Sequence, residues 1–175
     1  MILTDALLTI GNFGPLILFT ISLYLLRKTS NALYYYLIGF LFNFLLNVIL
    51  KLTFKQPRPR DNEDLFKLIL NYTTKNKCIL PYDIYGMPSG HSQSVIFSTI
   101  FIYLMFKNTN LTLLFLLISI ITIFQRVIEL HHTVFQVIVG SLVGLIFGYF
   151  IFFIYKQKMA GNLALKKDDN AFILL

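Results

Sequence analysis

Five long stretches of apolar residues alternate with short polar connections along the chain. A helix needs about 20 apolar residues to cross the hydrocarbon core of a bilayer, with a range of roughly 17 to 25. Four of the stretches meet this length, and the third meets it only if Ser89–His91 form its first turn. The stretches are Ala6–Leu26, Leu33–Leu50, Ser92–Phe106, Asn108–Gln125 and Thr133–Tyr155. The pattern predicts an all-α protein, a polytopic transmembrane helix bundle of about five spans.

We expect one membrane-embedded domain over residues 1–175. Its spans are predicted at about 6–26, 33–52, 89–106, 108–126 and 132–155, followed by a basic tail at 156–175. The first stretch has no basic segment before it and no clear small-residue cleavage site, so we expect a retained span rather than a removed signal peptide. Gly11, Gly14 and Pro15 predict a bend in this span, and nothing in it suggests chemistry.

The only long polar connection runs from Asp61 to Gly86. Its apolar residues favour a short amphipathic helix lying on the membrane surface. These residues are Leu65, Phe66, Leu68, Ile69 and Leu70. The sequence Asn71-Tyr72-Thr73 is a glycosylation sequon, which matters only if this loop is lumenal. The predicted fold is therefore a bundle with one longer loop that carries a surface helix.

Composition agrees with a membrane protein. Hydrophobic residues make up 57% of the chain and charged residues 13%, whereas a soluble domain has about 25% charged residues. Basic residues that flank membrane spans account for the net charge of +7, so we expect no nucleic-acid partner. A single cysteine, Cys78, excludes an internal disulfide.

Alternation of five spans brings several polar side chains to one membrane face. The ends of the second and fourth spans lie on the same side as the starts of the third and fifth. The side chains collected there are Lys51, Arg58, Ser89, His91, Arg126 and His132. The opposite face of the membrane carries the basic residues of the short loops and span ends. The positive-inside rule therefore predicts that this opposite face is cytoplasmic. These basic residues are Arg27, Lys28, Lys107, Lys156, Lys158, Lys166 and Lys167. The polar face is then lumenal or extracytoplasmic.

This polar face has the chemistry of a phosphate site. The turn Gly86–Gln93 opens a helix, and a helix N-terminus with its free N–H groups favours anions. Lys51, Arg58 and Arg126 add three cations at membrane depth, where charged residues are costly and functional use is the default hypothesis. Two histidines permit covalent transfer, in which one attacks phosphorus and the other protonates the departing oxygen. Other lysines of this face, Lys55, Lys67, Lys75 and Lys77, are interpreted as anchors at the headgroups.

Three segments in this order resemble the signature of the type-2 phosphatidic acid phosphatase superfamily. They are Lys51-x6-Arg58-Pro59, Pro88-Ser89-Gly90-His91 and Arg126-x5-His132. The resemblance implies that Lys51, Arg58 and Arg126 bind phosphate and that Ser89 and Gly90 add donors. It implies that His132 is the nucleophile, which forms a phosphohistidine, and that His91 is the general acid. The family mechanism needs no metal, and we expect no cofactor.

Two positions depart from the common pattern of this superfamily. Gln125 stands where a serine is usual, and Gln136 stands where an aspartate usually orients the nucleophile. At i+4 the carbonyl of Gln136 can still accept from the imidazole of His132, although it supplies no charge. With His132-Thr133 and the flanking Met87 and Gln93, this glutamine resembles the dolichyl-diphosphatase branch, whose members usually have serine where Gly90 stands.

That branch implies hydrolysis of a polyprenyl diphosphate to the monophosphate at the lumenal face of the endoplasmic reticulum. The substrate would then be a membrane lipid. Phosphatidic acid or another lipid phosphate is the alternative substrate. A catalytically silent scaffold or lipid-binding protein is the alternative from another class, motivated by the carboxylate missing at position 136.

Some remaining polar and small residues are assigned structural roles. Asn43 and Asn47 share one helix face, predicted to face protein. His131 is interpreted as interfacial, and Glu129 as a partner of Arg126 at i+3. The glycines at a spacing of four, Gly140, Gly144 and Gly148, allow close helix packing. That packing is either intramolecular, which we favour, or the seam of a homodimer.

Overall fold

The computed structural model describes residues 2–59, 67 and 84–171. The apolar residues that predict a surface helix, and the Asn71 sequon, lie outside these described residues. Within them the chain forms five helices and no strand, which confirms the all-α prediction. The helices are α1 (Ile2–Leu26), α2 (Ser30–Phe54), α4 (Gly90–Phe106), α5 (Thr109–Ile128) and α6 (Val134–Ala171).

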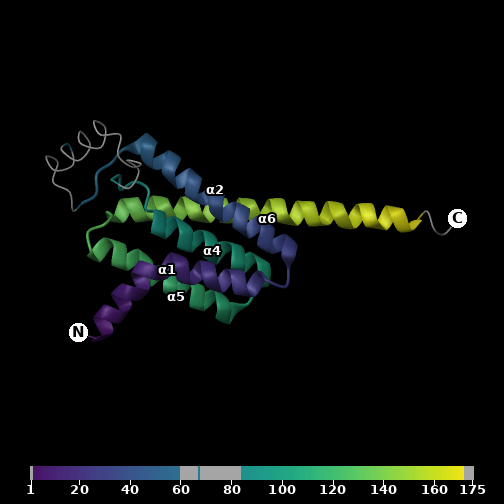
Figure 1. The fold of residues 1–175 in the computed structure, drawn as a ribbon, viewed down its shortest axis with the longest axis horizontal. Coiled ribbons are helices and arrows are strands. Elements are labelled where there is room, and N and C mark those ends of the chain that lie inside the picture. Colours follow the sequence, from purple (N-terminus) through teal and green to yellow (C-terminus); the bar gives the residue numbers. More distant parts are fainter. Residues whose placement is uncertain (1, 60–66, 68–83, 172–175) are drawn as a thin grey trace.

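The helices form an up-and-down bundle with α4 at its centre. α4 packs against each of the other four helices, and its contact with α6 is the most extensive, followed by that between α1 and α5. The ends of α2 and α5 lie at the same end of the bundle as the starts of α4 and α6 (Figure 1). We call this end the site end, because it holds the polar residues whose convergence alternation predicts.

Among the described residues, four helices, α1, α2, α5 and α6, are long and apolar enough to cross a membrane. Large apolar side chains such as Leu113, Phe124 and Ile146 are exposed on the outside of the bundle, where a bilayer would cover them. α4 has 17 residues, or about 25 Å at 1.5 Å per residue. It corresponds to the predicted third span and is enclosed by the other four helices.

The enclosure of α4 explains its polar side chains. Ser98 pairs with the hydroxyl of Tyr36 at 2.8 Å and Thr99 with that of Ser119 at 2.9 Å, and all four are buried. Buried hydroxyls need such partners. The rest of this region is an aromatic core in which Tyr36, Phe97 and Phe101 pack together. The core therefore lies away from the site end and holds α4 in position.

A ridge of three glycines allows α6 to pack directly on the backbone of α4. A Cβ added at Gly140 would lie 2.5 Å from the oxygen of Ser89, and one at Gly148 would lie 3.0 Å from that of Phe97; Gly144 faces the oxygen of Gln93 in the same way. The glycine face is thus occupied within one chain, as the intramolecular alternative predicts. A homodimer through this face stays a prediction.

The N-terminus of α6 differs from the prediction in one respect. α6 begins at Val134, so His132 precedes the helix instead of lying on it. The reason is a capping box, in which Thr133 Oγ1 accepts from Gln136 N and Gln136 Oε1 accepts from Thr133 N, both at 3.2 Å. The Thr133-x-x-Gln136 spacing was a sequence signal for this helix start.

At its other end, α6 continues past the predicted span. The helix continues to Ala171, into the region predicted as a basic tail. Lysine, glutamine, methionine and alanine, which fill positions 156–160, are good helix formers. The change from apolar to basic residues therefore does not end the helix.

Candidate active site

Backbone hydrogen bonds tie the three motif segments together at the site end. The N–H of Gly86 donates to the oxygen of Gln56 at 2.7 Å, which joins the turn before α4 to the segment after α2. The N–H of Ser89 donates to the oxygen of Gln136, and that of His132 to the oxygen of Arg126, both at 3.1 Å. The sequence spacing of the motifs thus becomes a fixed arrangement of four connected segments.

The imidazole of His132 is buried and held by two oxygen atoms. Its Nδ1 lies 2.8 Å from the backbone oxygen of Gly86 and 3.3 Å from Oε1 of Gln136. Because both oxygens can only accept, Nδ1 carries the proton and donates. In the neutral ring Nε2 then has the free lone pair, which is the form a nucleophilic histidine needs.

The surroundings of His132 favour this neutral form. Burial, together with the positive charges of Arg58 and Lys51, lowers the pKa of His132 to about 3, although the hydrogen bonds to Gln136 and Gly86 oppose the shift. Burial and nearby cations both disfavour an imidazolium. His132 is therefore neutral at physiological pH and lies within the field of two motif cations.

Gln136 contacts three residues through its side-chain amide. Besides the contact with His132, its Oε1 accepts from Thr133 N, and its Nε2 donates to the oxygen of Pro57 at 3.0 Å. A Cβ at Gly86 would lie only 2.6 Å from Oε1 of Gln136, so a larger residue in this turn would displace the amide of Gln136. The predicted contact between Gln136 and His132 is present, but Gly86 is the shorter partner.

The start of α4 presents backbone donors. Ser89 is the N-cap, and its Oγ accepts from the N–H and hydroxyl of Ser92 at 3.4 and 3.1 Å. The N–H groups of Gly90 and His91 belong to the first helical turn, which has no earlier carbonyl to bond. Ser89 has no exposed surface, and its own N–H is used by Gln136. Gly90 and His91 are thus the backbone donors best placed for an anion.

A buried amide network supports this turn from α2. Asn47 Nδ2 donates to Gln93 Oε1 at 2.8 Å and to the oxygen of Pro88 at 3.3 Å, and Gln93 Nε2 donates to Asn43 Oδ1 at 2.9 Å. Asn43 and Asn47 therefore face protein, as predicted. A Cβ at Gly90 would lie 3.1 Å from Asn47 Oδ1, so Asn47 fills the space beside this glycine.

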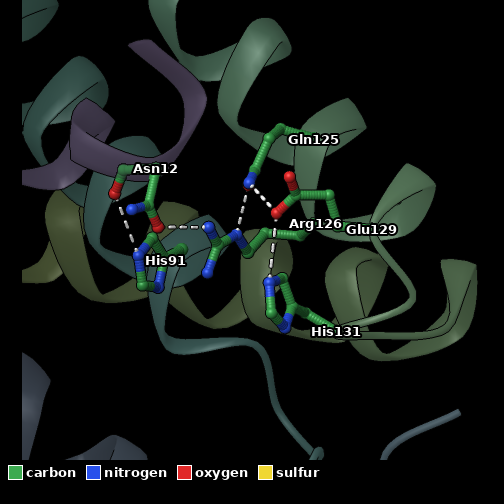
Figure 2. A network of polar contacts seen from close by, with 6 residues as sticks. All are labelled: Asn12, His91, Gln125, Arg126, Glu129 and His131. Carbon is green, nitrogen blue, oxygen red and sulfur yellow. Dashed lines mark hydrogen bonds and ion pairs between the residues drawn. The ribbon is translucent and has the colours of Figure 1, made fainter. Parts of the chain in front are cut away.

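Arg126 is held by Gln125 and by Asn12, of which the sequence did not indicate Asn12. Its Nε donates to Oε1 of the adjacent Gln125, and its Nη2 donates to Oδ1 of Asn12 in α1 at 2.6 Å. Figure 2 shows Asn12 between Arg126 and His91, whose Nε2 lies 3.2 Å from the backbone oxygen of Asn12. α1, for which we predicted no chemistry, thus contributes to the site.

Glu129 contacts Arg126 through Gln125, which differs from the direct pairing we predicted. Gln125 Nε2 donates to Oε2 of Glu129, and His131 Nε2 lies 3.2 Å from the same oxygen (Figure 2). Burial and the charge of Arg126 lower the pKa of His131, against the opposing effect of Glu129. His131 and Glu129 therefore form a pair beside Arg126.

Two hollows open at the site end, one polar and one largely apolar. The polar hollow, about 440 Å³, has polar lining residues Thr9, Asn12, Arg58, Gln125, Arg126, Glu129 and His131. The α1–α2 groove, about 350 Å³, joins the polar residues Asn12, Asn47, Lys51, His91 and Ser94, with Gly90, to the apolar Phe13, Leu16, Phe40 and Phe44. Asn12 and Phe13 line both hollows. His132 lines neither, and only 4% of its surface is exposed.

The site is rich in cations and poor in metal ligands. No group of three or more His, Cys, Asp or Glu side chains that could hold a metal ion occurs in the part of the chain that is described. The donor set of the site end instead consists of Lys51, Arg58, Arg126 and helix N–H groups, which suit an anion such as phosphate.

Comparison with known proteins gives two matches. The model of the PAP2 superfamily matches residues 32–160. A curated protein of Saccharomyces cerevisiae (strain ATCC 204508 / S288c), called dolichyldiphosphatase, is 35% identical over 126 residues, which cover 66% of this chain and 48% of that protein. The match thus spans about half the length of that relative. No solved structure matches the chain.

Proposed function

The chain belongs to the PAP2 superfamily, and we propose that it is an integral-membrane phosphatase that hydrolyses a polyprenyl diphosphate of the dolichyl type to the monophosphate. The observation that carries this proposal is the junction of the two hollows. Cationic residues that suit phosphate line one hollow, and the other extends from Lys51 and His91 along apolar side chains. A phosphate group joined to a hydrocarbon chain fits such a pair.

The α1–α2 groove has the dimensions for the start of a lipid chain. From Lys51 to Phe40 the helix α2 rises through 11 residues, or about 16 Å at 1.5 Å per residue. Phe13, Leu16, Phe40 and Phe44 supply its apolar walls. The matched protein is called dolichyldiphosphatase, and this similarity favours a polyprenyl chain over other lipids.

The proposed mechanism has two steps. First, Nε2 of His132 attacks phosphorus, the bond from phosphorus to the bridging oxygen breaks, and His91 gives its proton to that oxygen, which leaves with the lipid monophosphate. Second, His91 takes a proton from water, the water oxygen attacks phosphorus, and the P–N bond breaks to release inorganic phosphate. Lys51, Arg58 and Arg126, with the amides of Gly90 and His91, stabilise the charge on the transferred group. No step needs a metal ion.

We place this site on the lumenal or extracytoplasmic side, in the endoplasmic reticulum of a eukaryotic cell. The basic residues Lys107, Lys156 and Lys158 at the opposite end of the bundle support this orientation.

A substrate panel tests the activity. Purified protein in EDTA should release phosphate from a long-chain polyprenyl diphosphate with a higher kcat/KM than from phosphatidic acid or inorganic pyrophosphate. A preference for phosphatidic acid would support the glycerolipid alternative. Absence of phosphate release from every substrate would support the silent scaffold and contradict the proposal.

A variant of the groove tests the place of the lipid chain. Leu16→Trp would fill the apolar part of the groove and should lower kcat/KM for the long-chain diphosphate about tenfold or more, because overpacking a fitted apolar site costs about 1–3 kcal/mol. Leu113→Trp is the matched control, since Leu16 and Leu113 are both 59% exposed but Leu113 lies on α5 outside the groove. Equal activities of the two variants would place the chain elsewhere.

A further inference from the structure

Asn12 of α1 makes contact with two different groups of the candidate site. Its backbone oxygen accepts from Nε2 of His91 at 3.2 Å, and its Oδ1 accepts from Nη2 of Arg126 at 2.6 Å (Figure 2). Asn12 precedes residues 32–160, to which the family match extends. We propose that Asn12 is a positioning residue of this phosphatase, which sets Arg126 and His91 in place for the substrate. This inference rests on the proposed function.

The sequence around Asn12 brings α1 against α5 at the level of Arg126. A Cβ at Gly11 would lie 2.5 Å from Cβ of Gln125, and a Cβ at Gly14 would overlap Oγ1 of Thr122. Small residues at such positions let two helices approach closely. Gln125 directly precedes Arg126, so this contact places Asn12 within reach of the guanidinium.

Pro15 bends α1 three residues after Asn12. Proline has no N–H, and its ring crowds the carbonyl one turn earlier, so a helix bends at such a place. α1 contains Pro15 and is visibly bent (Figure 1). A carbonyl oxygen has two lone pairs, so the oxygen of Asn12, beside this bend, can accept from His91.

The side chain of Asn12 fixes the direction of Arg126. A guanidinium has five N–H donors in a rigid plane. Gln125 takes the donor on Nε and Asn12 takes one on Nη2, which leaves the other donors for a phosphate. If Asn12 Oδ1 were removed, the contact with Gln125 would remain among the described hydrogen bonds of Arg126. Gln125 is bonded to Glu129, and the carboxylate of Glu129 would then compete with the substrate phosphate for the guanidinium.

Asn12→Leu tests this role, because leucine has a similar size and lacks the acceptor. We expect kcat/KM for the polyprenyl diphosphate to fall about 10- to 100-fold, the usual effect of losing a hydrogen bond to a charged group. Thr20→Val is the matched control on α1: Thr20 is exposed, and its hydroxyl bonds only the helix oxygen of Leu16 among the contacts described. It should keep the wild-type kcat/KM within about twofold.

A double-variant comparison separates positioning from general damage. With Arg126→Lys, which cannot present the planar donors, Asn12→Leu should lower kcat/KM by less than about threefold, because the group it positions is already gone. An equal fall in both backgrounds would overturn the inference.

If Asn12→Leu unfolds, Asn12→Asp is a second variant that tests the positioning role of Asn12. It keeps an acceptor for Arg126 but reduces the positive charge there, so KM should rise while kcat changes little. Wild-type kinetic constants in Asn12→Asp, or a fully active Asn12→Leu, would overturn the inference while leaving the proposed function intact. An inactive wild-type protein would overturn the proposed function itself.

Discussion

At the scale of single residues, Gln136 does what the usual aspartate could not. Its amide donates to the oxygen of Pro57, next to Arg58, while its oxygen serves the helix cap and lies 3.3 Å from His132. A carboxylate has no N–H to donate. The missing charge is also less important here, because the neutral oxygen of Gly86 is the closer partner of Nδ1. The uncharged oxygens of Gly86 and Gln136 thus hold the imidazole of His132 while its pKa stays low.

Gln136→Glu tests this account through the pH profile. The added negative charge stabilises the imidazolium and so raises the pKa of His132 from about 3. A larger fraction of His132 is then protonated at mildly acid pH, and kcat/KM should fall at a higher pH than in wild type. Gln157→Glu, an exposed position of α6, adds the same charge far from the site and should leave the profile unchanged. Identical acid limbs in all three proteins would contradict the account.

Site residues could be predicted from the sequence when they carry a charge or an imidazole at the end of a span. Lys51, Arg126 and His132 could be predicted because a charge or imidazole at a span end is costly and therefore informative. Asn12 could not, since a single amide in a span has no periodic signal and its role depends on contact between α1 and α5. Roles assigned to these residues remain predictions until they are measured.

At the scale of elements, the packing of α4 on α6 builds the site. Gly140, Gly144 and Gly148 face the backbone oxygens of Ser89, Gln93 and Phe97, so both rows advance four residues at a time. The first of these pairs lies in the site itself, where Ser89 N also donates to the oxygen of Gln136. The spacing of the glycines could be read from the sequence, but their partner helix could not, because α4 shows no complementary pattern.

Gly144→Ala tests the importance of this contact for stability. Its Cβ would press on the backbone oxygen of Gln93, which cannot move without shifting α4. Overpacking of this kind costs about 1–3 kcal/mol, and 1 kcal/mol corresponds to about 2–4 °C in Tm for a chain of this size. Gly161→Ala is the control on the same helix, since nothing lies within 4 Å of its added Cβ, and its Tm should not fall. A Gly144→Ala variant as stable as wild type would mean that the helices can separate without cost.

At the scale of the whole molecule, the alternation of spans gathers the site. The membrane class, the helical bundle and the superfamily, all predicted from the sequence, are confirmed. The bend of α1, predicted from Gly11, Gly14 and Pro15, is present (Figure 1). The contact of α1 with α5 was not predictable, because it depends on which helices become neighbours. Orientation in the membrane stays a prediction from the distribution of basic residues.

Labelling of single cysteines tests that orientation. Lys55 and Lys107 are both exposed and both cap a helix with φ of 49°, but they lie at opposite ends of the bundle. On a Cys78→Ser background, Lys107→Cys should react with a membrane-impermeant maleimide in sealed vesicles whose cytoplasmic face is outward. Lys55→Cys should react only after the vesicles are opened. The reverse pattern would place the site on the cytoplasmic side.

The central claim is that His132 carries the transferred phosphoryl group, and trapping that group tests it most directly. Purified protein is mixed in EDTA with polyprenyl diphosphate labelled with ³²P at the terminal phosphate, and the reaction is stopped with alkali within one turnover. We predict alkali-stable, acid-labile label on the peptide that contains His132, and its loss in His132→Ala together with phosphate release. Label that persists in His132→Ala, or turnover by that variant, would contradict the account.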